Sequence, residues 1–195
     1  MKALLAAAIL TLSVAAHAAP ELGKPAPDFT AVNQDGKEVK LSDAKGKIVV
    51  LEWFNKGCPF VKKHYGSNNM QSLQKKYGKK GVVWYSIISS KEGKEGYLTP
   101  EQAKAELKGM GSKAILLDPK GDVGRLYQAK TTPHMFVIGK KGELLYMGGI
   151  DDNASADPED IKTAKNYVAA ALDETLAGKP VSASSSRPYG CSVKY

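Results

Sequence analysis

The stretch that decides the fold is VVLEWFNKGCPFVKKHYG, residues 49–66. It opens with a continuous apolar run, which is typical of a strand buried on both faces of a sheet. Cys58 follows the run, and Pro59 comes directly after it. Because proline is favoured at the first position of a helix, the stretch predicts a buried strand that leads into a helix with Cys58 as its cap.

A cysteine at this position has the surroundings of a reactive thiol. Its sulfur faces backbone N–H groups that lack helical partners, and these donors and the helix dipole favour the thiolate. Four nearby residues are expected to add positive charge: Lys56, Lys62, Lys63 and His64. We therefore expect Cys58 to be an attacking thiolate, with His64 on the surface or at the border of the site.

The rest of the chain alternates between strand and helix patterns. Residues 27–43 form a hairpin pattern around Asp35–Gly36, and a second hairpin covers residues 134–149. Buried strands are predicted at residues 47–54, 81–89 and 113–118. Helices are predicted at residues 59–77, 100–109, 123–128 and 158–177, with Thr99 and Asp157 as caps. This order predicts an α/β fold with a mixed central sheet flanked by helices.

The chain divides into three segments by composition. Residues 1–18 carry Lys2, an apolar run and an Ala-His-Ala sequence, the pattern of a secretory signal peptide. Residues 19–178 are long enough for one domain with its own core. Residues 179–195 are a Ser-rich linker followed by a tail that carries Cys191. We therefore expect an exported protein that is periplasmic, or otherwise extracytoplasmic, after cleavage.

Charge and motif content exclude some partners. The net charge is +8, but the basic residues are lysines spread along the chain, with only two arginines, Arg125 and Arg187. A nucleic-acid-binding surface usually has a clustered, arginine-containing patch, so no nucleic-acid partner is expected. Asp151 and Asp152 lack further ligands in the sequence, so neither a resident metal nor a cofactor is expected.

Three segments resemble a known family. LEWFNKGCPFVKK, residues 51–63, resembles the active-site segment of the thioredoxin fold, with Val61 in place of the second cysteine of Cys-x-x-Cys. TTPHMFVIGKKGELLYMGG, residues 131–149, resembles the segment that begins with the cis-proline, here Pro133. Residues 23–54 resemble the redoxin, or AhpC/TSA, branch, which has an extra N-terminal hairpin. The resemblance covers residues 23–177 and implies a thioredoxin-like fold and thiol oxidoreductase chemistry.

The resemblance also implies a substrate-binding region around the sulfur. Pro133, with its neighbours Thr132 and His134, would receive the substrate beside Cys58, and Pro59 would border it. Peroxiredoxins carry proline and a hydroxyl residue where this chain has Leu51 and Asn55. Asn55 can still hydrogen-bond an oxyanion. Arg125 is one candidate for the family's activating arginine.

The second cysteine has two interpretations. A disulfide between Cys58 and Cys191 could be a permanent structural bond in an exported protein. Alternatively, Cys191 on a flexible tail could reach Cys58 and resolve the sulfenic acid or mixed disulfide that a reactive thiolate leaves. Atypical two-cysteine peroxiredoxins likewise use a remote resolving cysteine.

We expect an exported thiol oxidoreductase, and a peroxiredoxin-like peroxidase is the preferred function. A thioredoxin-like protein-disulfide reductase is the alternative, and either requires a reducing thiol protein as electron donor, such as a membrane-linked one. A copper-binding chaperone is the other alternative, because Cys58, Cys191 and His64 or His134 could assemble around Cu(I).

Overall fold

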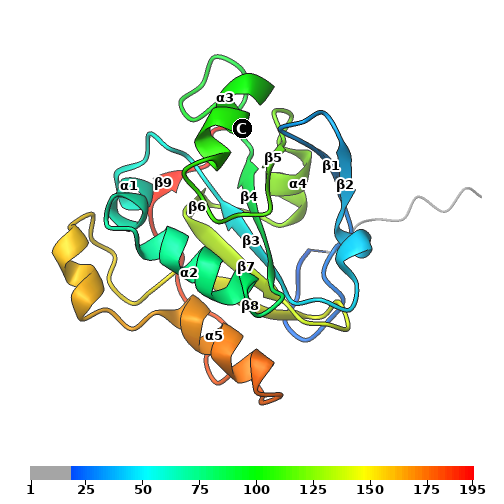
Figure 1. The fold of residues 1–195 in the computed structure, drawn as a ribbon, viewed down its shortest axis with the longest axis vertical. Helices are drawn as coiled ribbons and strands as arrows, with labels where there is room; N and C mark the ends of the chain where they lie inside the picture. The colour runs from blue at the N-terminus through cyan, green and yellow to red at the C-terminus, as the bar shows by residue number, and fades with distance from the viewer. Residues whose placement is uncertain (1–18) are drawn as a thin grey trace, which may run out of the picture.

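The computed structural model describes residues 19–195, and the predicted leader lies outside them. Seven strands form one mixed sheet in the order β2-β1-β5-β4-β3-β7-β8 (Figure 1). The strands are β1 (Thr30–Asn33), β2 (Glu38–Lys40), β3 (Val49–Trp53), β4 (Val83–Ile88), β5 (Ala114–Leu117), β7 (His134–Ile138) and β8 (Leu144–Gly148). The predicted central strand, β3, pairs parallel with β4 and antiparallel with β7, which explains why all five of its residues are buried.

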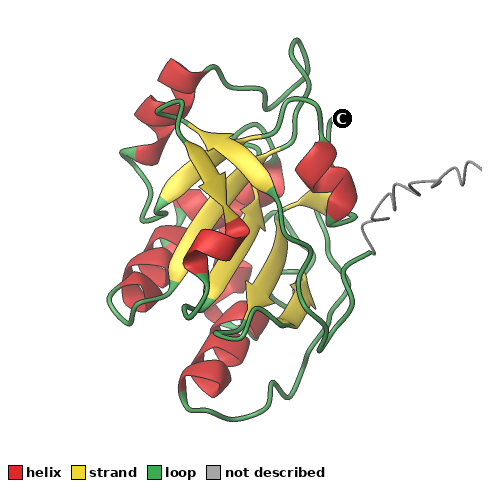
Figure 2. Ribbon diagram, turned by 90° about the vertical axis from the view of Figure 1, so that its right-hand side faces the viewer, coloured by secondary structure: helices red, strands yellow, loops and turns green. Residues whose placement is uncertain are grey.

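Helices cover both faces of this sheet (Figure 2). They are α1 (Pro59–Gly66), α2 (Asn69–Gly78), α3 (Pro100–Leu107), α4 (Asp122–Leu126) and α5 (Tyr167–Leu176), with short 3-10 turns at η1 (Leu41–Ala44) and η2 (Pro158–Lys162). Because side chains alternate along a strand, Leu51 and Trp53 pack toward η1 and α4, whereas Val50 packs toward α2 and α5. The predicted α/β fold with a mixed sheet is confirmed.

Two predicted helices are each divided in the structure. The helix expected at residues 59–77 breaks after Gly66, because Asn68 has a left-handed backbone (φ 60°) and the Ser67 hydroxyl donates to the Lys63 carbonyl. The helix expected at residues 158–177 is a short 3-10 turn, η2, followed by a separate helix, α5. The cap of α5 is Asn166, whose side chain accepts a hydrogen bond from the Ala169 N–H. In contrast, the predicted cap Thr99 is present, and its side chain forms a reciprocal capping box with Gln102.

The tail does not extend freely from the domain. After α5 it turns back along β8, where the Met147 N–H donates to the Ser184 carbonyl over 3.1 Å and the Ser186 N–H donates to the Met147 carbonyl over 3.2 Å. It then forms β9 (Cys191–Ser192), which pairs with β6 (Thr131–Thr132) in a separate two-stranded sheet beside α1 (Figure 1). The segment expected to be flexible is therefore docked on the domain.

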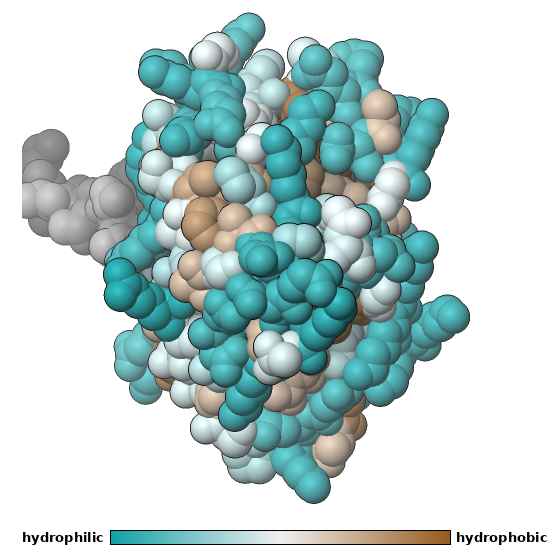
Figure 3. Space-filling view, turned by 90° about the vertical axis from the view of Figure 1, so that its left-hand side faces the viewer, coloured by the Kyte–Doolittle hydropathy of each residue, from teal (hydrophilic) through white to brown (hydrophobic). Residues whose placement is uncertain are grey.

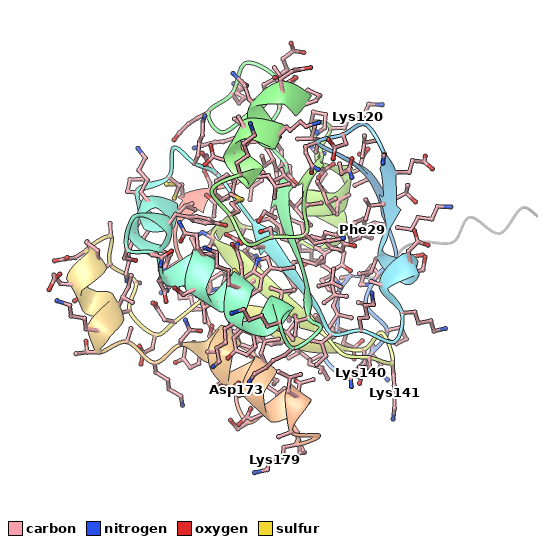
Figure 4. All side chains as sticks on the ribbon, viewed as in Figure 1. Phe29, Lys120, Lys140, Lys141, Asp173 and Lys179 are labelled. Carbon is pink, nitrogen blue, oxygen red and sulfur yellow. The ribbon has the colours of Figure 1, made fainter. Side chains whose placement is uncertain are left out.

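Many lysine side chains lie at the surface of the molecule. Lys120, Lys140, Lys141 and Lys179 project outward from the periphery (Figure 4). The face on the α1 and η2 side is mainly hydrophilic, with apolar residues in small, separate spots (Figure 3). Among residues 19–195, no helix has the length and apolar character needed to cross a membrane.

A buried carboxyl group lies under α1 and α2. Glu52 of β3 is fully buried and accepts hydrogen bonds from the Trp84 indole N–H (2.8 Å), the Tyr65 hydroxyl (2.9 Å) and the Gln74 amide (3.2 Å). Burial raises its pKa to about 7, although these donors oppose the increase. The sequence did not single out this residue, because its partners come from α1, α2 and β4.

The pKa of Glu52 predicts a pH dependence of stability. Because its pKa is raised in the folded state, its contribution is complete below about pH 4.5 and is lost as the pH rises through about 7. The linked change is roughly 3 kcal/mol. Urea unfolding at pH 5 and pH 8 should therefore show a larger loss of stability in the wild type than in Glu52→Gln. The exposed-site control Glu92→Gln should behave like the wild type, and equal pH dependence in all three proteins would contradict the prediction.

Candidate active site

Cys58 lies where β3 gives way to α1. It is the N-cap of α1, with Pro59 exposed at the first helical position. The Cys58 N–H donates to the Asn55 carbonyl over 3.1 Å, which fixes the turn between strand and helix. The side chain itself is fully buried, with 0% exposure. The expected strand–cysteine–helix arrangement is present, but the thiol is covered rather than open to solvent.

The predicted cis-proline lies against this thiol. The Thr132–Pro133 peptide bond is cis, and the Cys58 thiol donates to the Thr132 carbonyl over 3.0 Å. β9 pairs antiparallel with β6 so that Cys191 lies directly opposite Thr132. Cys191 packs on the apolar cluster that contains Cys58, both cysteines are free thiols, and Cys191 lies close enough to lower the pKa of Cys58. The structure therefore brings together Cys58, Thr132, Pro133 and Cys191.

Two tyrosines anchor the tail on either side of Cys191. Tyr189 is 8% exposed, and its hydroxyl donates to Asp151 and lies 3.1 Å from Nε2 of His64. The Tyr195 hydroxyl donates to the Ala129 carbonyl over 2.8 Å, and its ring lies 4.7 Å from the Arg125 guanidinium carbon. These contacts hold the strand that carries Cys191 at both ends.

Two glycines allow the tail to lie close to the domain. Gly190 has φ 133°, a conformation that side chains disfavour, and a Cβ atom there would overlap the Thr132 carbonyl. The ring of Tyr195 packs over Gly124, where a Cβ atom would lie 2.5 Å from Cε1 of the tyrosine. Backbone and ring can therefore lie against the domain only because glycine occupies both positions.

Opposing effects set the ionisation of Cys58. Burial raises its pKa, but hydrogen bonding from the Cys191 thiol and from the N–H groups of Val61 and Cys191 outweighs burial, so the pKa lies below the ordinary value. The Val61 N–H is close enough to act in this way, although it does not form a full capping hydrogen bond. The thiolate is thus favoured by the tail as well as by the helix start.

Cys191 has the opposite preference. Burial and the neighbouring Cys58 raise its pKa to about 12. In the reduced pair, Cys58 is therefore the group that ionises and Cys191 is the group that keeps its proton.

Two residues that hydrogen-bond Cys58 through their backbone carbonyls each carry a polar side-chain group without a partner within residues 19–195: the Asn55 amide nitrogen and the Thr132 hydroxyl. Asn55 is 1% exposed, and its side-chain oxygen, Oδ1, accepts a hydrogen bond from the Gly57 N–H over 2.8 Å. Buried polar groups are almost always paired, so both groups are available to a bound partner. The residue type at Asn55 drew attention to it in the sequence, but its unpaired nitrogen is visible only in the fold.

The positive charge expected around Cys58 is largely absent. His64 is fully buried rather than on the surface, and burial lowers its pKa to about 3, so it is neutral at physiological pH. Lys63 is also buried and donates to the Asn153 carbonyl, with Asp151 at 3.9 Å. Lys56 is exposed and lies 3.9 Å from Glu106. The local hydrogen bonds therefore contribute more to the Cys58 thiolate than nearby cations do.

The other predicted residues lie in different surroundings. His134 is buried in β7, where its ring packs 4.5 Å from Phe136 and its Nδ1 accepts from the Lys130 N–H. Arg125 donates to the Lys120 carbonyl and stacks on Tyr195, not on Cys58. Among residues 19–195, no group of three or more histidine, cysteine or acidic side chains is arranged to hold a metal.

The effect of Cys191 on the ionisation of Cys58 predicts a pKa change in a variant that lacks the Cys191 thiol. Cys191→Ala removes the side-chain donor that lowers the Cys58 pKa, so Cys58 should ionise at a higher pH in this variant. Titration of the thiolate ultraviolet absorbance measures this midpoint. Cys58→Ala identifies the contribution of Cys191, and an unchanged Cys58 midpoint in Cys191→Ala would contradict the assignment.

The fit of Gly190 predicts a change in access. Gly190→Ala forces β9 away from Thr132, so iodoacetamide should alkylate Cys58 at least roughly tenfold faster, in line with a strain of 1–3 kcal/mol. Mass mapping of each cysteine measures the rate. Gly78→Ala is the matched control, because the space around Gly78 is open. Equal rates in the two variants would show that β9 does not cover Cys58.

Known proteins resemble the chain over most of the domain. The ResA thiol-disulfide oxidoreductase of Bacillus thuringiensis subsp. konkukian is 29% identical over 126 residues, which are 64% of this chain and 68% of that protein. Peroxiredoxin-2 of Cricetulus griseus is 56% identical over only 43 residues, 20% of this chain and 22% of that protein.

The solved structures and the family model agree with this resemblance. The crystal structure of an uncharacterized conserved protein from Geobacillus kaustophilus covers 90% of this chain and 92% of its own, with a TM-score of 0.73 and 30% identity. Solved thioredoxin domains share the fold at lower identity. The AhpC/TSA family model matches residues 22–147. With the paired thiols at the cis-proline, these matches make the chain a thiol-dependent oxidoreductase that belongs to the AhpC/TSA family.

Proposed function

We propose that the protein is a thiol-disulfide oxidoreductase that reduces disulfides in other proteins, with Cys58 as the attacking thiol and Cys191 as the resolving thiol. The observation that carries this proposal is the contact between the two thiols beside Pro133. The reaction needs no further group from the chain, because one thiol ionises readily and the other holds a proton.

The forward reaction consists of two exchanges. The Cys58 thiolate attacks one sulfur of the substrate disulfide, the substrate S–S bond breaks, and its other sulfur leaves as a thiolate. Loss of the negative charge on Cys58 removes one cause of the high Cys191 pKa, so Cys191 can release its proton. The Cys191 thiolate then attacks the Cys58 sulfur, which releases the reduced substrate and forms the Cys58–Cys191 disulfide.

The return reaction begins at the other sulfur. With the tail docked, Cys191 is partly exposed whereas Cys58 is fully buried, so a reducing thiol protein reaches the Cys191 sulfur first. The substrate of the forward reaction, in contrast, reaches Cys58 after the tail moves aside. Cys58 is also the better leaving group, because its pKa is the lower of the two. The donor supplies two electrons, leaves as a disulfide, and restores both thiols.

A protein disulfide is a better substrate for this site than a peroxide. The sequence favoured the peroxidase, but the ResA oxidoreductase matches a far longer part of the chain than peroxiredoxin-2 does. Asn55 stands where a peroxiredoxin carries a hydroxyl, and its side-chain oxygen already accepts a hydrogen bond from the Gly57 N–H. Copper binding gains no support, because His64 and His134 are engaged by Tyr189 and Lys130.

The proposal includes export. The pattern of residues 1–18 supports cleavage and a periplasmic or other extracytoplasmic location, where disulfide substrates occur. Cell fractionation of a bacterial host that expresses the full chain tests this point. The mature protein should be found outside the cytoplasm, and a full-length cytoplasmic protein would contradict export.

Insulin reduction with dithiothreitol as donor tests the proposed reaction. The wild type should accelerate the reaction well above background, and Cys58→Ser should lose the acceleration. Cys191→Ser, the matched control, should turn over slowly and accumulate a mixed disulfide between Cys58 and insulin. Equal rates for the wild type and Cys58→Ser would contradict the proposal. Rapid consumption of hydrogen peroxide by the wild type, without insulin reduction, would favour the peroxidase instead.

A further inference from the structure

The side chain of Tyr189 occupies a defined socket, formed by Phe60, Lys63, His64 and Asp151. The Tyr189 ring packs edge-on against Phe60, with centroids 5.8 Å apart, and the Lys63 ammonium lies 5.8 Å from the centroid. The hydroxyl reaches the base of the socket, where it bonds Asp151 and His64. The socket therefore recognises both the ring and the hydroxyl of a tyrosine.

The spacing from this socket to the reactive sulfur is fixed. Tyr189 is followed by Gly190, which passes the Thr132 carbonyl with no room for a side chain, and then by Cys191 opposite Thr132. The surface thus fits an extended segment with the order tyrosine, glycine, cysteine. The cysteine of that segment is the one whose sulfur meets Cys58.

A substrate can reach Cys58 only after this segment leaves. Cys58 has no exposed surface while β9 is paired with β6, so the disulfide of another protein cannot contact its sulfur. When Tyr189 departs, the Asp151 carboxylate and the His64 ring each lose their contact with its hydroxyl, whereas Lys63 keeps its hydrogen bond to the Asn153 carbonyl. An apolar side chain in the socket would bury these groups again without a partner, whereas a phenol restores both contacts, so the socket favours a phenol.

The neighbouring surface leaves room for an incoming chain. A cavity of about 570 Å³ runs beside the socket, and Asp152, Tyr167, Arg187 and Gly190 are among its lining residues. This cavity borders the same segment of the tail that must move. An incoming chain can therefore approach the socket and β6 from this side.

We infer that the Tyr189 socket is a substrate subsite that selects disulfide-bearing segments with a tyrosine two residues before the reactive cysteine and a glycine between them. This inference rests on the proposed reductase function. The substrate segment replaces β9, pairs with Thr131 and Thr132, and puts its disulfide sulfur where the Cys191 sulfur lies. The Cys58 thiolate then attacks that sulfur, the substrate S–S bond breaks, and the distal sulfur leaves as a thiolate.

The inference is tested with full-length Cys191→Ser and short peptides whose cysteine is activated as a disulfide with thionitrobenzoate. The peptides are Pro-Tyr-Gly-Cys-Ser-Val and its variants with phenylalanine or alanine for tyrosine, and with alanine for glycine. Release of thionitrobenzoate follows the formation of the mixed disulfide on Cys58. The parent peptide should react at least roughly tenfold faster than the alanine variants, with the phenylalanine variant between them.

Two further variants separate the socket from general opening of the tail. Tyr189→Ala, combined with Cys191→Ser, empties the socket and should increase the preference for the tyrosine peptide. Tyr195→Ala in the same background loosens the other end of the tail and should accelerate all peptides equally. If the peptides react at equal rates with Cys191→Ser, the subsite is refuted while the reductase function stands. If no peptide reacts with Cys58, the reductase function and the subsite are refuted together.

Discussion

The pairing of β9 with β6 is the contact on which the site depends. It places Cys191 opposite Thr132, whose carbonyl accepts from the Cys58 thiol, and so brings into contact two cysteines that are far apart in the sequence. The approach is close enough to require Gly190 at one point. Without this short pairing, Cys58 would have no second thiol, because Val61 occupies the position of the usual partner.

The contacts between the tail and Cys58 favour the thiolate and also bury the sulfur. Hydrogen bonds from Cys191 lower the pKa of Cys58, yet the strand that supplies them leaves the sulfur fully buried. Formation of the internal disulfide needs little movement, whereas contact with an external disulfide needs the tail to move aside. The tail therefore both activates the thiol and limits what reaches it, and the anchors at Tyr189 and Tyr195 set how readily it opens.

Local patterns predicted most of the fold and the centre of the site. The apolar run before Cys58 and the helix start at Pro59 can be recognised because each depends on neighbouring residues, whereas the cis-proline at Pro133 followed from the resemblance to the thioredoxin fold. The sequence predicted that Cys191 can reach Cys58 and that the tail can dock through Pro188 and Tyr189. It did not predict the strand pairing that holds the tail, because the Ser-rich composition resembles a linker and the contacts are made by distant residues. His64 was misplaced for the same reason: its partner Tyr189 lies 125 residues away. The break at Asn68 depends on a single left-handed residue.

A redox titration of the full chain tests the central claim, that Cys58 and Cys191 form one reversible redox pair, most directly. The protein is equilibrated in glutathione buffers of increasing oxidising strength, alkylated after an acid quench, and mapped by mass spectrometry. The structure predicts a single transition to an intramolecular Cys58–Cys191 disulfide, with the same midpoint from the reduced and the oxidised side. A stable glutathione adduct on Cys58 with Cys191 still a free thiol would contradict it.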